Sequence, residues 1–487
     1  MSFMLGTLAM STFMRCGRFG GLLILWLAAA SPVALGQEPG EAQEVDQDSC
    51  GTDLPEDSQE ALRSAFAEEP EKAESRFPVH GSFSLQYRFR KSHDESDHDL
   101  HSVLALDVGE ETQNPVRFHF LGRVTADLDG ISEDDESSAF DGLVDVFDQS
   151  VVGLIYECSL DFDGPAPIEV IRLGRQSLID TPVVAGLDGA LVESEPFGKL
   201  EATLGAYGGL PTHLYESSYE GDLLAGAYAQ ARPWRSARLR VDWMHVDDER
   251  EGLGFDDDLF GIGFWQGIGG SMQVDVRATF LEEASRDLRL LATCQHAPTE
   301  LRVQASYYEL FHTQRQASIE IDPFYSSALD YFPYRQAGLS VARSFGECFD
   351  VAAGTDVRRL RESGDTGPFN REFERYYLAP TFHDFLVDGT DLTITGDLWD
   401  ADDDATAAVG VELLRTFKES LDARIGSSYA LFKQDFYDVS ERFDVRTYYL
   451  SIDCRASKRL RLAGRYELEL DDFDTYHNLR IGATWTF

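Results

Sequence analysis

Apolar and polar side chains alternate strictly over the last ten residues of the chain. The apolar positions are Leu479, Ile481, Ala483, Trp485 and Phe487, and the residues between them are polar or small. Successive side chains of a strand point to opposite faces, so this segment would have one apolar and one polar face. An apolar face that ends in a C-terminal aromatic residue predicts the closing strand of an outer-membrane barrel. A soluble edge strand can alternate in the same way, so the prediction depends on the rest of the chain.

The same alternation recurs from residue 81 onward. It is clearest over residues 116–128, where Val116, Phe118 and Phe120 share one face while Arg117 and His119 share the other. Further segments of this kind are residues 81–90, 238–246, 272–281, 300–308, 421–431 and 460–470. They are about 9 to 11 residues long, the length at which a tilted strand crosses a bilayer. Strands of soluble sandwiches are usually shorter.

The connections between these segments alternate in length. Short connections include residues 163–167, 195–198, 233–236, 267–270, 297–299, 417–420 and 457–458. Long connections are predicted at residues 129–149, 209–221, 247–257, 311–334 and 361–372. Short periplasmic turns and long outer loops are typical of outer-membrane barrels. We therefore predict an all-β protein, a transmembrane antiparallel β-barrel of about 22 strands (between about 18 and 22), with both termini on the periplasmic side.

An export signal is predicted at the N-terminus. Arg15 and Arg18 precede an apolar run at residues 21–30, and small residues follow at positions 34 and 36. The run is too short for a spanning helix, which needs about 20 apolar residues, and the pattern is typical of a cleaved signal peptide. We predict a signal peptide over residues 1–36, an acidic periplasmic leader over 37–79, and a barrel over 80–487. A leader that plugs the lumen is an open alternative.

Charge and cysteine content narrow the possible partners. The formal net charge is −44 at pH 7, which argues against a nucleic-acid partner. Much of the acid lies in predicted long connections, either as solvated loops or as sites for divalent cations that bridge surface lipids. The six cysteines form no C-x-x-C pair. Cys158, Cys294 and Cys454 share parity with apolar neighbours, so we expect them to face lipid rather than to form disulfides.

Arginines recur on the polar parity of the predicted strands. Charge on the lipid face is costly, so these side chains should point into the lumen. The predicted pore-lining residues are Arg117, Arg123, Arg172, Arg175, Arg238, Arg240, Arg277, Arg302 and Arg465. Guanidinium groups bind carboxylates and phosphates, and an arginine-lined pore favours anions. Inward carboxylates such as Asp127, Asp242 and Glu467 could instead pair with these arginines and brace the wall.

The sequence gives no indication of an enzyme, a cofactor or a metal site. It contains no G-x-S-x-G elbow and no glycine-rich phosphate loop before a helix. His119 stands alone on a polar face, and His93, His98 and His101 near the first outer loop are interpreted as solvated residues rather than zinc ligands.

One segment resembles a known family. The sequence L-G-R-Q at residues 173–176, followed after a loop by D-G-A at residues 188–190, resembles the alginate-export family of outer-membrane porins. The motif covers Arg172, Arg175, Gln176, Asp188 and Gly189. The resemblance implies a basic lumen through which an anionic polyuronate leaves by diffusion. That family's barrel has fewer strands than predicted here.

Function and partners are expected accordingly. We expect a porin-like channel for anionic solutes or for export of an anionic polysaccharide such as alginate. The expected partners are outer-membrane lipid and lipopolysaccharide, the solute or polysaccharide, and the barrel-assembly machinery, which would engage the last strand ending at Phe487. The open alternative is a structural or adhesive barrel with acidic surface loops and an occluded lumen. A lipid-active barrel enzyme is a third class.

Overall fold

The computed structural model describes the chain from residue 77 to its end. It describes residues 77–487 apart from 93–94, 111–112, 130–148, 213–220, 251–252, 312–332, 365–369, 402–403, 419, 435–440 and 472–473. The predicted signal peptide and almost all of the predicted leader therefore lie outside the described residues, as does His93.

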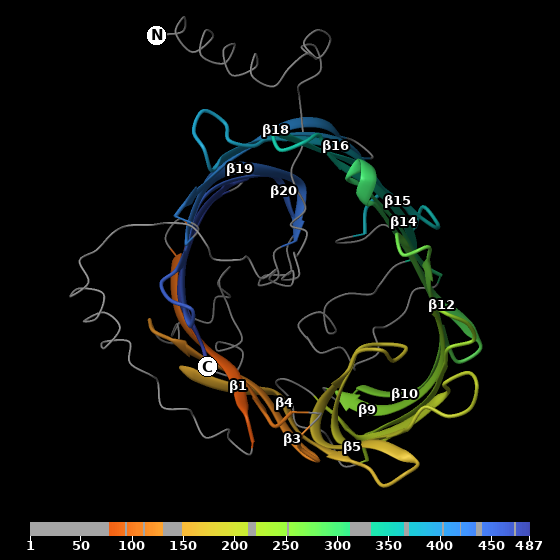
Figure 1. Ribbon diagram of the computed structural model, residues 1–487. Helices are drawn as coiled ribbons and strands as arrows, with labels where there is room; N and C mark the ends of the chain where they lie inside the picture. The colour runs from red at the N-terminus through yellow and green to blue at the C-terminus, as the bar shows by residue number, and fades with distance from the viewer. Residues whose placement is uncertain are drawn as a thin grey trace, which may run out of the picture.

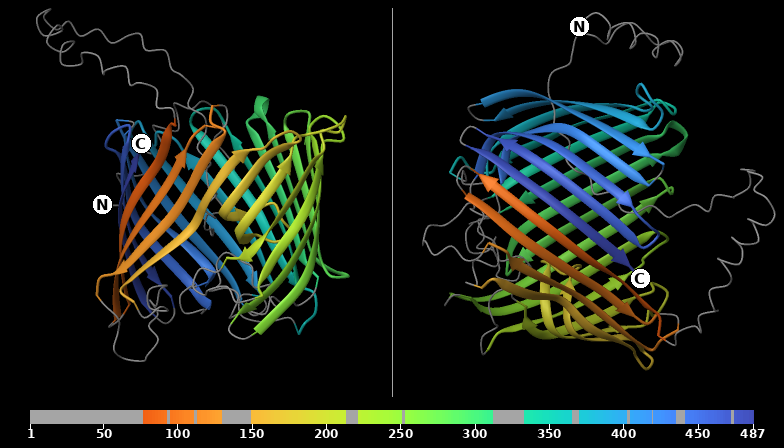
Figure 2. Two further views of the ribbon diagram at one scale, coloured as in Figure 1. Left: turned by 90° about the horizontal axis from the view of Figure 1, so that it is seen from below. Right: turned by 90° about the vertical axis from the view of Figure 1, so that its left-hand side faces the viewer.

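The described residues form one closed antiparallel barrel of 22 strands (Figures 1 and 2). Each strand pairs with its sequence neighbours, and β1 (Val79–Ser92) also pairs with β22 (Thr475–Thr486), which closes the sheet. The predicted fold class and strand number are confirmed. A single 3-10 turn, η1 (Ala297–Thr299), is the only helical element within the described residues. No helix there has the length and apolar character needed to span a membrane.

The remaining strands follow in chain order. Their bounds are β2 (Glu95–Val108), β3 (Val116–Asp127), β4 (Val151–Asp163), β5 (Ile168–Leu178), β6 (Ala185–Ser194), β7 (Thr203–Pro211), β8 (Leu223–Ala231), β9 (Ala237–Arg250), β10 (Leu253–Ile268), β11 (Met272–Leu281), β12 (Ala284–His296), β13 (Leu301–Leu310), β14 (Tyr334–Ser344), β15 (Phe349–Leu360), β16 (Phe373–Phe382), β17 (Thr390–Ala401), β18 (Asp404–Phe417), β19 (Leu421–Gln434), β20 (Glu441–Arg455) and β21 (Leu460–Leu470). Residues 247–250 and 253–257 belong to a predicted long connection, and they instead continue the paired ladder of β9 and β10.

The two faces of the wall differ as the alternation predicts. The outer face exposes large apolar side chains such as Leu85, Ile481 and Trp485, which suits contact with lipid. The inner face carries buried ion pairs, among them Arg88 with Asp99. Cys158, Cys294 and Cys454 are free thiols. Their register partners are outer-face residues, which confirms their predicted placement.

The closing strand is fixed to β1 at its last residue. The backbone N–H of Gly81 donates to the carbonyl of Phe487 at 3.2 Å, and the N–H of Phe487 donates back at 3.1 Å. The Phe487 ring lies over Gly81, where an added Cβ would come within 2.9 Å of the ring. The same Cβ would come within 2.5 Å of the backbone carbonyl oxygen of Ala105, so a side chain here would disturb both the neighbouring backbone and the terminal aromatic residue.

The ladder between neighbouring strands stops part-way at two places. We call the barrel end at which Val79 and Phe487 lie the terminal end and the opposite end the loop end. The β4–β5 ladder runs only between residues 158–163 and 170–175, and the β18–β19 ladder only between 411–417 and 421–427. In each case the loop-end half of the junction is unpaired. In each junction an arginine donates to a backbone carbonyl in the unpaired part of β4 or β18. Arg175 donates to Ile155 at 3.0 Å, and Arg446 donates to Val409 at 2.6 Å.

Beyond the β18–β19 junction, the loop-end half of the β19–β20 hairpin turns into the lumen. Tyr429 and Leu431 share strand parity with the exposed outer residue Ile425, yet both are buried against Ala408 on the inner face of β18. Figure 1 shows β19 and β20 inside the ring at β18. This hairpin narrows the lumen on one side.

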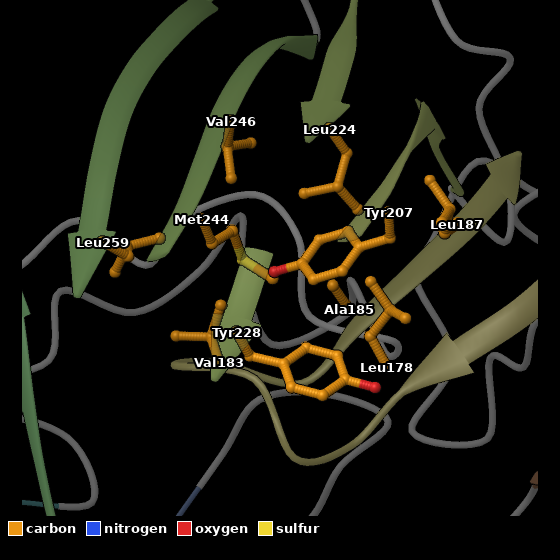
Figure 3. Packing of buried hydrophobic residues seen from close by; sticks show 10 residues of the cluster. All are labelled: Leu178, Val183, Ala185, Leu187, Tyr207, Leu224, Tyr228, Met244, Val246 and Leu259. Atoms are coloured by element: carbon orange, nitrogen blue, oxygen red, sulfur yellow. The ribbon is translucent and has the colours of Figure 1, made fainter. Parts of the chain in front are cut away.

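Beyond the β4–β5 junction, strands β5 to β10 curl inward around an apolar cluster. Leu178, Val183 and Ala185 come from the β5–β6 connection and its flanks, and they pack on inner-face residues of β7 to β10 (Figure 3). The partners from those strands are Tyr207, Leu224, Tyr228, Met244, Val246 and Leu259. The β5–β6 loop, residues 179–184, is therefore folded into the lumen instead of outward.

Candidate pore lining

Strand register brings arginines of distant sequence position into two lines across the inner wall. In the first, Arg424 of β19 faces Ser451 of β20, which faces Arg465 of β21. Arg465 then faces Arg480 of β22, which faces Arg88 of β1. We call Arg424, Arg465, Arg480 and Arg88 the first arginine row. Neighbouring strands lie about 4.8 Å apart, so three of these side chains start from adjacent positions.

The first arginine row is only partly neutralised. Arg88 is buried, and its Nε donates to Asp99 at 2.8 Å. Arg465 and Arg480 share one carboxylate, Glu467, at 2.8 Å and 4.0 Å. The side chains of Arg465 and Arg480 are each 45% exposed, whereas Glu467 is 14% exposed. Two solvated guanidinium groups thus reach the lumen beside a single carboxylate.

A second arginine row lies on the opposite part of the wall. Arg240 of β9 faces Gly263 of β10, which faces Arg277 of β11, and Arg277 faces Arg289 of β12. The line continues through Tyr308 and Gln336 to Arg358 of β15. We call Arg240, Arg277, Arg289 and Arg358 the second arginine row.

Neutral groups hold part of the second arginine row. Arg277 donates to the backbone carbonyl of Asp180 at 3.0 Å and to that of Thr181. Arg358 donates to the amide oxygen of Gln336 at 3.0 Å and lies over the Tyr334 ring. These contacts orient the guanidinium groups through neutral partners.

Like charges directly opposite each other are unfavourable for the sheet. They destabilise an antiparallel pair by roughly 0.2–1 kcal/mol. Pairing of opposite charges would avoid this loss of stability. The wall contains such opposite-sign pairs elsewhere, for example Asp161 opposite Arg172. Arg465 opposite Arg480, and Arg277 opposite Arg289, are therefore poorly explained by bracing alone.

Several of the predicted pore-lining arginines do brace the wall. Arg172 binds Asp161 with two bonds of 2.6 Å and 2.7 Å, and Arg117 donates to Asp163 at 2.7 Å. Arg240 donates to Asp242 on its own strand at 2.8 Å. For Arg172, Arg117 and Arg240, the alternative that inward arginines pair with carboxylates and brace the wall therefore holds.

The other predicted arginines have different surroundings. Arg123 is held by neutral groups, the Thr125 hydroxyl and the His101 ring, each at 3.0 Å. Arg238 has its Nη1 3.8 Å from Asp180, and Arg302 is exposed near the terminal end. By register both lie on the inner face.

Arg175 does not belong to the lumen set. Its register partners Cys158 and Asp188 are on the outer face, and its guanidinium binds Asp188 at 2.8 Å near the loop end. Strand β5 keeps its alternation through Gly174, so Arg175 faces outward. The prediction that Arg175 lines the pore is wrong. The positive φ of Gly174, +118°, does not reverse the side-chain direction.

Sequence reasoning missed Arg289, Arg358 and Asp180. Two leucines follow Arg289, which breaks the alternation, and Arg358 is followed by a second arginine that faces outward and binds Glu374. Asp180 lies in a short connection, where nothing in the sequence indicates an inward fold. Strand register identifies Arg289 and Arg358, and the contacts of Asp180 with Arg238, Arg240 and Arg277 identify the third.

Metal ligands are not clustered in the part of the chain that the structure describes. No group of three or more His, Cys, Asp or Glu side chains is placed there to hold a metal ion. His98 and His101 are separated by the strand, since His98 contacts Tyr87 on the outer face and His101 contacts Thr125 on the inner face.

Comparisons with known proteins find similarity of structure only. No model of a known protein family matches the sequence, and no curated protein matches it. The structure is similar to Pseudomonas aeruginosa OccK3 (OpdO), with a TM-score of 0.42 and 11% identity over 84% of this chain and 95% of that one. It is also similar to P. aeruginosa OpdK with vanillate, at a TM-score of 0.42 and 9% identity over 84% and 98% of the two chains. Acinetobacter baumannii OccAB2 gives a TM-score of 0.39 and 11% identity over 84% and 98%.

The chain is a β-barrel of the bacterial outer membrane. The closed strand order and the exposed apolar outer face carry this conclusion. The structures named above do not bear on alginate export, so the resemblance to that family stays a prediction.

Proposed function

We propose that this barrel is a porin-like channel through which small anionic solutes diffuse. The observation that carries the proposal is the direct succession of Arg465, Arg480 and Arg88 on three adjacent strands. Such a succession costs stability, so a role in the lumen accounts for it better than wall bracing does. Fixed guanidinium charges in a partly dehydrated lumen lower the barrier for anions to enter.

The narrowing of the lumen strengthens the effect of these charges. The β19–β20 hairpin turns inward (Figure 1), and the β5–β6 loop packs inside the wall through Val183 (Figure 3). Each adjoins an arginine row, since Arg424 lies on β19 and Arg277 donates to the loop at Asp180. Solutes would therefore pass near Arg465 and Arg277. Low-dielectric walls at short range focus the field of each charge.

Inward carboxylates oppose the preference for anions and limit how strong that preference is. Asp161, Asp163 and Asp397 each pair with an arginine, and Glu467 is shared by two. The proposed channel is thus mildly anion-preferring rather than strictly selective. Guanidinium rows also suit a polyuronate such as alginate, whose repeated carboxylates could move from one arginine to the next.

One observation favours a second candidate function. Both inward-turned parts are packed by buried apolar clusters, which would also suit an occluded structural or adhesive barrel. Single-channel recording separates the two candidates because an occluded barrel gives no defined conductance steps.

The test uses the purified full chain in a planar bilayer under a KCl gradient. The proposal expects discrete conductance steps and a reversal potential shifted toward the chloride equilibrium potential. Arg465→Gln should shift this reversal potential toward the potassium equilibrium potential. Arg343→Gln is its matched control, because Arg343 is an exposed outer-face residue and each substitution removes one positive charge. A cation-preferring wild type, or the absence of steps, would overturn the proposal.

A further inference from the structure

Asp180, near the start of the inward β5–β6 loop, lies among three arginines of distant strands. Its carboxylate Oδ2 is 3.8 Å from Nη1 of Arg238 and 4.0 Å from Nη1 of Arg240, both on β9. Its backbone carbonyl accepts a bond of 3.0 Å from Arg277 on β11. The loop thereby passes β7 and β8 to contact β9, and passes β10 to contact β11.

The loop is held in this position independently of the Asp180 side chain. Arg277 binds backbone oxygens of Asp180 and Thr181, and the Thr181 hydroxyl donates to the carbonyls of Leu178 and Val183 at 3.0 Å and 2.6 Å. Val183 is buried in the apolar cluster of Figure 3. Removing the carboxylate charge should therefore leave the loop in place.

The arginines around Asp180 keep free donor capacity toward the lumen. Arg240 uses Nε for Asp242 at 2.8 Å and stacks on the Tyr228 ring at 3.8 Å, so its orientation is fixed while its terminal nitrogens face Asp180. Both distances from Asp180 exceed hydrogen-bond length. The Asp180 side chain is 57% exposed and that of Arg238 is 41% exposed, so solutes can reach both. The Arg240 side chain is 13% exposed, so a solute would meet Arg238 first and contact Arg240 at its terminal nitrogens.

We propose that Asp180 is a built-in carboxylate that competes with carboxylated solutes for a binding site formed by Arg238 and Arg240. The proposal rests on the proposed channel function and names the residue that sets the affinity of this site. A guanidinium pair without Asp180 would hold a small monocarboxylate by short, charge-assisted bonds. With Asp180 present, the solute replaces a loosely held ion pair and leaves easily. Conduction needs such weak binding, since a tightly held solute blocks the pore.

The experiment measures how sodium benzoate blocks the KCl current of Asp180→Asn in planar bilayers. We expect the half-blocking concentration to fall by at least about twofold relative to wild type, the effect of one unit charge about 10 Å away in water. Benzyl alcohol, a neutral molecule of similar shape, should block both proteins equally. Adding Arg238→Gln to Asp180→Asn should reverse the gain.

Two matched variants separate a local site from a general change of charge. Asp188→Asn removes a carboxylate from the outer face, and Asp275→Asn removes one from the inner face at a position facing Trp265. If Asp275→Asn lowers the half-blocking concentration as much as Asp180→Asn does, Asp180 acts only through the overall field and the proposal is overturned. Unchanged block in Asp180→Asn, with the variant correctly folded, overturns it as well.

The same recordings keep this proposal distinct from the proposed function. A wild type that prefers anions but shows no specific effect of Asp180 contradicts only the Asp180 site. A wild type that prefers cations contradicts the channel's proposed selectivity. Correct folding of each variant is checked by gel electrophoresis, where a folded barrel changes its mobility when the sample is heated.

Discussion

Arg480 of β22 lies directly opposite Arg88 of β1, so the two strands that close the barrel place like charges side by side. Arg88 is neutralised by Asp99, while Arg480 remains solvated in the lumen. Closure is therefore achieved despite the charges, by the backbone ladder and the apolar outer face, which includes Ile481 and Trp485.

The first prediction concerns the closing strand. We expect the double variant Trp485→Asp and Phe487→Asp to be lost from the outer-membrane fraction. Charge on the lipid face costs up to about 1 kcal/mol even near the interface, and the ring that covers Gly81 is lost too. Thr484→Asp is the control, because Thr484 is on the inner face of the same strand. Normal membrane levels of the double variant would contradict the account.

The second prediction concerns the buried pair of Arg375 and Asp397. Their side chains are 7% and 0% exposed, and Nε of Arg375 donates to Asp397 at 2.8 Å. Arg375→Leu should lower the free energy of unfolding by about 3–5 kcal/mol, since it removes the guanidinium that binds this buried carboxylate with two hydrogen bonds. Arg461→Leu should cost at most about 1 kcal/mol, because the pair of Arg461 with Asp453 is exposed. Urea unfolding in detergent measures both, and equal losses would count against the assignment of Arg375 as a buried brace.

The third prediction concerns the inward half of the β19–β20 hairpin. Tyr429→Ala with Leu431→Ala removes its packing on Ala408, and buried Leu→Ala changes cost about 2–5 kcal/mol. We expect single-channel conductance to increase or to fluctuate, since the hairpin would leave its place in the lumen. Ile425→Ala, on the exposed outer face of the same strand, should leave conductance unchanged. If the double variant conducts like wild type, the hairpin does not narrow the ion path.

The fourth prediction concerns pH and His383, in the turn between β16 and β17. Burial by itself lowers the pKa of His383, but its bonds to Asp350 at 3.0 Å and Asp391 at 3.2 Å outweigh burial and raise the pKa. A raised pKa means that the charged imidazole stabilises the fold below its ordinary pKa, and that this stabilisation disappears as pH rises through the raised value. His383→Gln should therefore lower the unfolding temperature more at about pH 5 than at about pH 9. A difference from wild type that does not change with pH would show that the histidine acts only as a neutral spacer.

Alternation along the sequence predicted the faces of the barrel but not the neighbours of each residue. Strand parity depends only on counting, which is why the lipid-facing position of Cys454 and the inner position of Arg465 follow from the sequence. Which residue lies opposite which depends on the offset between strands. That offset is set by turns and by interrupted ladders such as the one between β4 and β5.

The arginines of the candidate pore lining show the same limit of prediction from sequence. Arg172 and Arg465 have the same polar parity, yet the first lies opposite a carboxylate and the second opposite another arginine. Their different roles appear only when the strands are in register. The inward course of the β5–β6 loop depends on long-range contacts of Asp180 and Thr181 with Arg277, which no local pattern contains.

The central claim is that the solvated arginines of the first row make the lumen favour anions. The most direct measurement is the zero-current reversal potential of wild type beside Arg465→Gln/Arg480→Gln, with Arg465→Lys/Arg480→Lys as the charge-conserving control. We expect anion preference for wild type and for the lysine variant. We also expect a shift toward cations for the glutamine variant of at least about twofold in permeability ratio, the effect of a unit charge about 10 Å from the ion path. A wild type that prefers cations, or a glutamine variant with the wild-type reversal potential, would contradict the claim.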